Sequence, residues 1–238
     1  MKGKRKKISF FIFSILKILN KISFYFFKYD FLIYLPNFII NSYYKKILIL
    51  NKEIKFFIPN DIIDWRIKTF FQKEPETLEW IDSFDKRKEK ILWDIGANIG
   101  LYSIYAALKY DNIIIYSFEP STSNLRTLSR NISINKLENK INIVPFALTN
   151  KENKFLLMNE SEFTEGGALH TFGENFDFEG NILKKTNNYS IYGTTVNYLV
   201  SESIIPSPDY IKIDVDGIEH LILNGADKVL GNKKLKSI

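Results

Sequence analysis

The chain has 238 residues, of which 45% are hydrophobic and 15% aromatic; this is enough for one buried core and gives no case for two catalytic domains. It contains no cysteine, which excludes disulfides, thiolate metal sites and mechanisms with a cysteine nucleophile. Residues 1–50 hold ten basic residues and one acidic residue, whereas residues 51–238 hold 23 basic and 26 acidic ones. Because a domain that grips a nucleic-acid backbone carries its own basic stripe, nucleic acid is disfavoured as a substrate.

Residues 1–50 form a basic, apolar extension ahead of the rest of the chain. After the basic run at residues 2–7, the sequence predicts a helix whose polar residues fall within a narrow arc: Ser14, Lys17, Lys21 and Lys28. The longest uncharged runs, residues 8–16 and 31–44, fall short of the ~20 apolar residues that a spanning helix needs. We therefore expect no transmembrane segment.

Three interpretations of this extension stay open. A cleaved secretory signal is the least favoured, because cleavage needs small residues and no alanine precedes Ala97. Peripheral contact with an anionic membrane face is the favoured one, and it places the protein in the cytoplasm or on the inner face of the membrane. The third is a helix that packs on the domain or on a partner.

Residues 51–90 are predicted as a lead-in strand and helix, and residues 91–238 as the main domain. There, a short apolar strand ends in Asp94, a turn with Gly96 and Gly100 follows, and an apolar helix begins. This pattern places a carboxylate and backbone amides at the carboxyl edge of a sheet and predicts a nucleotide-cofactor cradle. Nicotinamide binding is the weaker interpretation, because Asn98 and Leu101 stand where a dinucleotide fingerprint needs glycine.

The next predicted strand, residues 112–118, ends at Glu119 and Pro120. An α/β cofactor fold presents an acid at this place to the hydroxyls of a ribose. Pro120 stops the strand, and Ser121 or Ser123 can cap the helix that follows. The alternative is that Glu119 only caps that helix.

Residues 158–198 are polar and lack helical periodicity, which predicts a strand-poor lid over an acceptor site. His170 is an outside candidate for a general base in this lid, although a plain surface position is favoured.

A strand at residues 209–213 is predicted to break into a helix that carries three carboxylates and a histidine. Asp216 or His220 is the candidate general base, and Glu219 is expected to orient the acceptor. Alternatively, Asp216 and Glu219 form a capping box that only starts the helix. A divalent metal bridging Asp214 and Asp216 is least favoured, since no further ligand is evident, and we predict no metal.

Together with the segment Glu74–Ile81 and a predicted strand at residues 141–148, these motifs resemble the FkbM-type family of S-adenosylmethionine-dependent methyltransferases, over about residues 53–238. The resemblance implies a class I methyltransferase fold, which is an α/β domain with a mostly parallel, Rossmann-like sheet and helices on both faces. It implies that the third motif faces the acceptor. It also implies S-adenosyl-L-methionine as cofactor, with Asp94, Gly96, Ala97, Asn98 and Gly100 at its methionyl and ribose end, Glu119 at the ribose, Phe146 and Ala147 at the adenine, and Pro120 and Asp214 beside them.

The chain departs from the family pattern in two places. Asn197 stands where family members commonly carry an aspartate. Residues 234–238 look like the opening of a fifth strand, whereas the class I fold normally has seven, so we expect an incomplete C-terminus. A truncated reading frame, a half completed by another chain and a non-catalytic donor-binding protein stay open as explanations.

These observations predict an O-methyltransferase that uses S-adenosylmethionine. Methylation at C5 of a pyrimidine needs a cysteine, and the Asn-Pro-Pro-aromatic tetrapeptide typical of exocyclic amine methylation is missing, so oxygen is the expected acceptor atom. The expected acceptor is a hydroxyl of a glycan or a related small metabolite. A lipid or polyketide-like acceptor is the alternative.

Overall fold

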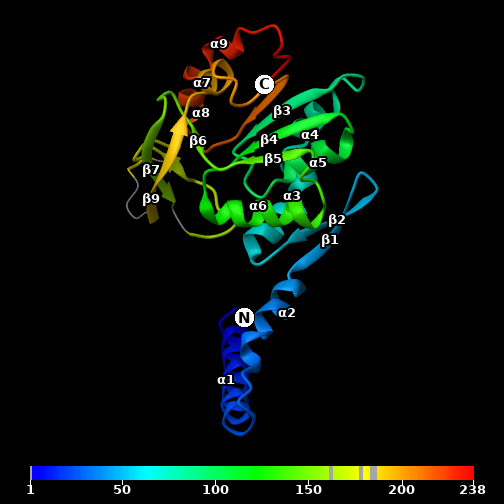
Figure 1. Cartoon of the computed structure of the whole chain (residues 1–238), viewed down its shortest axis with the longest axis vertical. Coiled ribbons are helices and arrows are strands. Elements are labelled where there is room, and N and C mark those ends of the chain that lie inside the picture. The colour runs from blue at the N-terminus through cyan, green and yellow to red at the C-terminus, as the bar shows by residue number, and fades with distance from the viewer. Residues whose placement is uncertain (1, 161–162, 177–178, 183–186) are drawn as a thin grey trace. The chain divides into compact units, whose positions relative to one another are not determined.

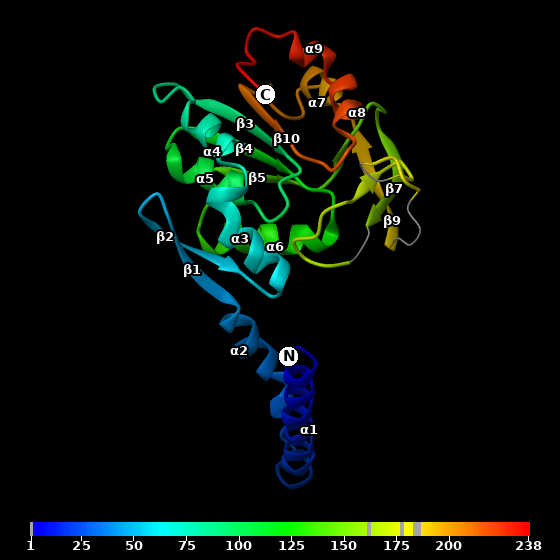
Figure 2. The same cartoon turned by 180° about the vertical axis from the view of Figure 1, so that it is seen from behind.

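The computed structural model describes residues 2–160, 163–176, 179–182 and 187–238. The chain divides into two units, residues 1–45 and residues 46–238, and each is described by itself. Figures 1 and 2 show both from opposite sides.

The first unit is helical and reverses direction once. It contains α1 (Lys2–Phe27), the short 3-10 helix η1 (Phe31–Ile33) and α2 (Leu35–Ser42). Asp30 fixes the reversal, because its carboxylate accepts hydrogen bonds from Asn20 Nδ2 at 2.8 Å and from Leu32 N at 3.2 Å.

The length of α1 corrects our expectation that no segment is long enough to span a membrane. Lys7–Phe27, 21 residues, is long and apolar enough to cross one by length and composition, and none of its residues is buried. The uncharged runs were shorter only because Lys17 and Lys21 interrupt them; the helix continues through both.

The second unit begins with a hairpin and two helices ahead of the main sheet. Its elements are β1 (Tyr44–Ile49), β2 (Lys52–Phe57), α3 (Asp61–Lys73) and α4 (Pro75–Asp82). Asn60 caps α3, since its side-chain oxygen accepts from Ile63 N at 2.9 Å.

The central sheet is parallel throughout, as the class I fold requires. Its strands β3 (Lys90–Ile95), β4 (Ile113–Phe118), β5 (Ile141–Val144) and β10 (Tyr210–Ile213) lie in the order β10-β3-β4-β5. The chain therefore proceeds from β3 to β4 and β5 and later returns to the other side of β3. Ligands of open α/β sheets bind outside the carboxyl ends of the strands at such a switch point.

Helices cover both faces of this sheet, which confirms the predicted α/β layering (Figures 1 and 2). One core joins Leu92, Ile113 and Ile115 to α3, α4, α5 (Leu101–Lys109) and α6 (Thr122–Ile134). The other joins Trp93, Ile95 and Phe118 to α7 (Val196–Ser201), α8 (Glu219–Asn224) and α9 (Asp227–Leu230).

A second sheet occupies the stretch in which we predicted a strand-poor lid, and that prediction is wrong. The sheet has the order β6-β9-β7-β8, with β6 (Ala147–Leu148), β7 (Lys154–Glu160), β8 (Thr171–Phe172) and β9 (Asn187–Thr194). Strands β7 and β9 are antiparallel, and β7 leaves Phe155 and Leu157 exposed on one face. The four consecutive apolar residues of β7, residues 155–158, lie on both faces of the strand, so it lacks the alternation that marks a half-buried strand in a sequence.

The C-terminal residues pair with the edge of the parallel sheet where a fifth strand was expected. Ser237 forms a parallel bridge with Tyr210, and Lys236 N donates to Asp209 O at 2.8 Å.

Two asparagines of α6 attach the lead-in hairpin to the domain and provide a matched test of buried hydrogen bonds. Asn131, fully buried, accepts from Phe57 N and donates to Ile99 O, both at 2.9 Å. Asn135, partly exposed, bonds the backbone of Lys55 at 2.9 and 2.7 Å. We expect Asn131→Ala to lower the free energy of unfolding in urea by about 2–4 kcal/mol, because two buried backbone groups lose their partners. Asn135→Ala should lower the free energy of unfolding by less than about 1 kcal/mol, since water can take the place of the Asn135 side chain in its hydrogen bonds. Equal losses of stability in the two variants would contradict this account.

Candidate functional site

The turn between β3 and α5 brings three strand ends together. Gly96 has φ +80°, and a Cβ built there would lie 1.9 Å from the carbonyl oxygen of Asp214 at the end of β10. Gly96 N and Ala97 N both donate to Phe118 O, at 2.9 and 3.0 Å. These amides are thus used inside the protein, which corrects the expectation that they would be offered to a cofactor.

Asp94 lies beneath this turn and belongs to a buried network of charges. Its Oδ2 accepts from Ser103 Oγ at 2.6 Å, and its Oδ1 lies 3.4 Å from Lys212 Nζ. Lys212 also lies 3.5 Å from Asp214 Oδ2. Burial lowers the pKa of Lys212, but these two carboxylates and Glu74 outweigh it and raise the pKa above its ordinary value. Asp94 therefore supports the turn and does not line a cavity.

Glu119 stands at the end of β4, nearly buried, with both carboxylate oxygens held by backbone amides. Oε2 accepts from Asn98 N at 2.7 Å and Oε1 from Ser121 N at 2.9 Å. Ser121, not Glu119, caps α6, because its hydroxyl accepts from Asn124 N. Burial raises the pKa of Glu119 to about 7, although the two amide hydrogen bonds lower it. Glu119 is thus a buried, hydrogen-bonded acid with a raised pKa on a cavity wall.

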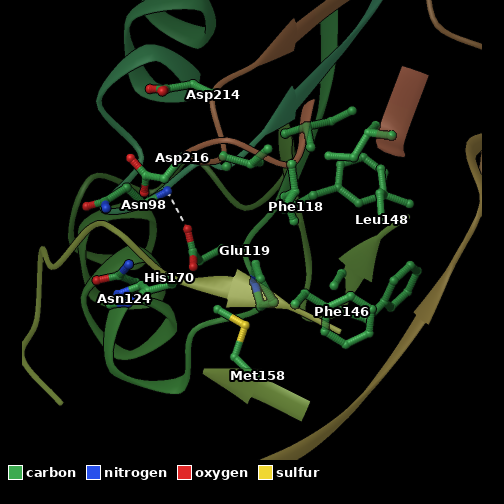
Figure 3. A pocket seen from close by; sticks show the side chains of 18 of the residues that line it. Asn98, Phe118, Glu119, Asn124, Phe146, Leu148, Met158, His170, Asp214 and Asp216 are labelled. Carbon is green, nitrogen blue, oxygen red and sulfur yellow. Dashed lines mark hydrogen bonds between the residues drawn. The ribbon is translucent and has the colours of Figure 1, made fainter. Parts of the chain in front are cut away.

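A cavity, which we call the main cavity, opens at the carboxyl ends of β3, β4 and β10. Figure 3 shows Glu119 between an apolar side, with Phe118, Phe146, Leu148 and Met158, and a polar side, with Asn98, Asn124, His170 and Asp216. The predicted residues that line it are Gly96, Asn98, Glu119, Pro120, Phe146, Ala147, Asp214 and Asp216. Gly100, Glu219 and His220 do not, and His220 is exposed.

A segment at residues 164–170, which we call the strap, crosses the polar side of this cavity. Gly167 O accepts from Asn98 Nδ2 at 2.8 Å and from Asn124 Nδ2 at 3.2 Å. Leu169 N donates to Asp216 Oδ2 at 2.7 Å. The strap thus joins the glycine turn, the start of α6 and the turn after β10.

His170 ends the strap and is buried against the cavity, so the favoured surface position is wrong. It is 9% exposed, and within the described ranges neither ring nitrogen has a hydrogen-bond partner. Burial lowers the pKa of His170, Glu160 and Asp216 oppose that shift, and Arg66 adds to it. Composition could not reveal this burial, because distant residues hold the strap in place.

The turn after β10 does not contain the alternative capping box. Asp216 and Gly217 have φ +59° and +104°, and α8 begins only at Glu219. The Glu219 carboxylate accepts from Gly217 N at 3.0 Å and from Val215 N at 3.2 Å, so it holds the turn. No group of three metal-binding side chains occurs among the residues that the structure describes.

A second cavity lies on the other side of the glycine turn and shares Gly96, Asn98 and Asp214 with the first. Its wall also contains cations and anions that the sequence did not single out as a site: Arg66, Lys73, Glu74 and Lys212. Glu74 accepts from Tyr102 OH at 2.7 Å and from Lys73 Nζ at 2.8 Å. Burial raises the pKa of Glu74, but these hydrogen bonds lower it overall. The mixed charge suits a zwitterionic group.

A parallel sheet with helices on both faces, an acid at the end of the second strand and cavities on both sides of a glycine turn define a nucleotide-cofactor α/β domain of the class I methyltransferase kind. Residues 94–236 match the Methyltransferase FkbM domain, and the chain belongs to that family. S-adenosylmethionine is the methyl donor of the family. The resemblance seen in the sequence is therefore confirmed.

Similarity to individual proteins is local. Methyltransferase sdnD of Sordaria araneosa is 38% identical over 66 residues, which are 28% of this chain and 26% of that protein, so the match spans about a quarter of the relative. The precorrin-6y C5,15-methyltransferase of Geobacter metallireducens GS-15 is 16% identical with a TM-score of 0.38, over 69% of this chain and 56% of that one. The C-terminal domain of the Rhodobacter capsulatus precorrin-6Y C5,15-methyltransferase is 22% identical with a TM-score of 0.28, over 32% of this chain and 40% of that one.

The residues present fit the donor of this family. Three buried polar atoms of cavity-lining residues have no partner within the described ranges: Asn98 Oδ1, His170 Nδ1 and His170 Nε2. Buried polar atoms are normally hydrogen-bonded, so a polar ligand is the natural partner here.

Gly96 and Gly180 both have a left-handed backbone conformation, but only Gly96 lies close to another strand, so the two positions allow backbone strain to be measured separately from close packing. Gly96 and Gly180 have φ +80° and +83°, but a Cβ at Gly180 meets no atom within 4 Å. We expect Gly180→Ala to lower the free energy of unfolding by about 1–2 kcal/mol, the cost of the left-handed conformation. Gly96→Ala should cost at least about 2 kcal/mol more, because β3 and β10 must move apart; urea unfolding measures both. Similar losses in the two variants would show that the approach to Asp214 is unimportant.

Proposed function

We propose that the chain is an S-adenosylmethionine-dependent O-methyltransferase that acts on a hydroxyl of a glycan or a related small metabolite. The observation that carries this proposal is the division of the main cavity by Glu119 into an apolar and a polar side, next to a cavity of mixed charge. The donor has an adenine, a ribose and a zwitterionic end in that order. The sequence of environments along the sheet edge matches it.

In this proposal the apolar side holds the adenine between Phe118, Phe146 and Met158. Glu119 accepts hydrogen bonds from the ribose hydroxyls on the lone pairs that its two amide partners leave. The second cavity holds the zwitterionic end near Lys212, Glu74 and Arg66. When bound, S-adenosylmethionine supplies an electrophilic methyl group on its sulfonium.

The acceptor side of the proposal uses Asp216 and His170 as the candidate proton acceptors. Both line the main cavity, and a positioned base contributes about 10²- to 10⁴-fold to such a reaction. His170 replaces His220 in this role, because His220 is exposed outside the cavity. Glu219 positions the turn through backbone hydrogen bonds and does not reach the acceptor.

Charge and composition bear on the choice of acceptor. The second unit has a small excess of acidic residues, which disfavours nucleic acid, and the missing cysteine disfavours carbon methylation of pyrimidines. A lipid acceptor is the second candidate, favoured by the exposed apolar side chains of α1.

Calorimetric titration of S-adenosylmethionine into the purified full chain is the first test. We expect saturable binding to the wild-type chain. Glu119→Ala should abolish this binding, and the exposed control Glu138→Ala should preserve it, while circular dichroism shows that the wild-type chain and both variants are folded. A folded chain that does not bind the donor would refute the proposed function. Transfer of labelled methyl to a panel of sugars, lipids and polyphenols then separates the acceptor classes.

Donor binding should depend on pH through Glu119. The unliganded pKa is about 7, and ribose hydroxyls that donate to the carboxylate favour its charged form, so the bound pKa is lower. Affinity should therefore rise with pH, by up to about tenfold per unit below pH 7, and level off above it, with proton release on binding. Calorimetry in buffers of different ionisation enthalpy measures both quantities. Glu119→Gln should remove the dependence, and an affinity that falls as pH rises would contradict it.

The two histidines of the chain allow a direct test of His170. In NMR spectra of histidine-labelled protein, with His170→Asn for assignment, the His170 imidazole should titrate below its ordinary pKa of about 6.5 because it is buried. S-adenosylmethionine should shift the His170 signals and leave those of the exposed His220 unchanged. Unchanged His170 signals at saturating donor would place His170 outside the site.

A further inference from the structure

The first unit exposes apolar side chains along its whole length. Among the described residues, 19 of the 33 exposed large hydrophobic side chains lie between Ile8 and Tyr43. None of the residues of Lys7–Phe27 is buried, and neither η1 nor α2 has a buried residue. A soluble surface rarely carries so large a contiguous apolar patch, so another medium or molecule covers it.

The charges of this unit are almost all positive, and three lysines of α1, Lys7, Lys17 and Lys21, lie on one side of that helix. Residues 1–45 hold nine basic residues and one acidic residue, whereas residues 46–238 hold 24 basic and 26 acidic ones. Lys7, Lys17, Lys21 and Lys28 recur at helical spacing, within the arc that also contains Ser14. Ile12 and Leu19 lie on the opposite side of the helix and are 53% and 50% exposed. The helix thus has a narrow cationic stripe and a broad apolar face.

Two lysines of this stripe lie over aromatic rings of the same unit. Lys17 Nζ lies 5.4 Å from the ring centre of Phe13, and Lys28 Nζ lies 5.7 Å from that of Phe24. Cationic and aromatic side chains therefore lie together, as they do at the interface between water and the apolar layer of a membrane.

The reversal after α1 is rich in exposed aromatic residues. Tyr25, Phe26 and Phe27 are 74%, 69% and 78% exposed, and the rings of Tyr29 and Tyr34 stack at 6.2 Å. Tyrosine is enriched where headgroups meet acyl chains, because its ring is apolar and its hydroxyl is wet.

We propose that residues 1–45 bind a lipid bilayer that contains anionic lipids, with α1 along its surface and the apolar face in the acyl layer. Charge decides against a second copy of the chain as occupant, since both surfaces would carry the same strong positive charge. It also favours the surface over a crossing arrangement, because Lys17 and Lys21 would lie within the acyl layer of a spanning helix. Anionic headgroups complement the stripe. The proposal is independent of methyl transfer.

Vesicle flotation with the intact full chain tests this proposal. The protein is mixed in mild detergent with vesicles of phosphatidylcholine, or of phosphatidylcholine and phosphatidylglycerol at about 7:3, and the detergent is removed before flotation in a density gradient. The test variant is Ile12→Asp/Leu19→Asp, on the apolar face. The matched control is Phe155→Asp/Leu157→Asp, which adds the same charge at side chains of β7 that are 73% and 49% exposed. Circular dichroism and intact mass confirm that each protein is folded and complete.

We expect the wild-type chain and the control variant to float with the anionic vesicles. Smaller fractions of both proteins should float with neutral vesicles, or with anionic vesicles in 1 M salt. The test variant should show a ratio of bound to unbound protein at least about tenfold lower. Equal flotation of the two variants, or none of the wild-type chain, would overturn the proposal. Another result would also overturn it: the wild-type chain does not bind vesicles but self-associates, and only the apolar-face variant loses this self-association. A second copy of the chain would then be the occupant of the apolar face. Loss of the first 45 residues in cells, seen by intact mass, would indicate a cleaved segment and refute it as well.

Discussion

The absence of a side chain at Gly96 is the constraint on which the rest of the site depends. Because the Gly96 backbone lies against the carbonyl of Asp214, the ends of β3 and β10 meet without a gap. The amides of the same turn bind Phe118 O and the Glu119 carboxylate, which attaches the end of β4. Glu119, on one side, and the turn that carries Asp216, on the other, are therefore positioned by a single turn. A group bound across it contacts all three strands.

Beneath the turn, the buried strands contain a cation, Lys212, and a carboxylate, Asp94, where strands of this kind are normally apolar. Removing Lys212 and Asp94 from water is costly, and their mutual attraction offsets it only with further partners. Those partners are present: Ser103 donates to Asp94 at 2.6 Å, and Lys212 lies 4.9 Å from the ring centre of Tyr102. The network leaves cations and anions of similar number around the second cavity. In the proposed function, this mixed charge complements the zwitterionic end of the donor better than it would a simple anion.

Local sequence was sufficient for the parts of the fold that are made of local structure. The strand, glycine turn and helix around Gly96, and the acid after β4, follow from spacing, because each is a run of consecutive residues with its own apolar pattern and turn residues. The strands β7 and β9 escaped prediction because they pair across a long connection and because the apolar run of β7, residues 155–158, lacks the alternation of a half-buried strand. The burial of His170 depends on the hydrogen bonds that Asn98 and Asn124 donate to the strap and that Asp216 accepts from it, and none of these residues is near His170 in sequence. Lys212 gave a signal that we did not use, a charge between Ile211 and Ile213 in a buried strand.

The turn after β10 shows why a motif does not assign roles to its residues. The pattern Asp216-x-x-Glu219 is that of a capping box, yet positive φ at Asp216 and Gly217 is incompatible with a helix that begins there. Glu219 satisfies the amides of the turn instead, and this leaves Asp216 to accept from Leu169 in the strap. One carboxylate thereby becomes a positioning group, while the other shares the cavity wall with His170. The pKa of His170 is consequently set by burial under the strap, which lowers it, and by Glu160, Asp216 and Arg66, none of which belongs to helix α8.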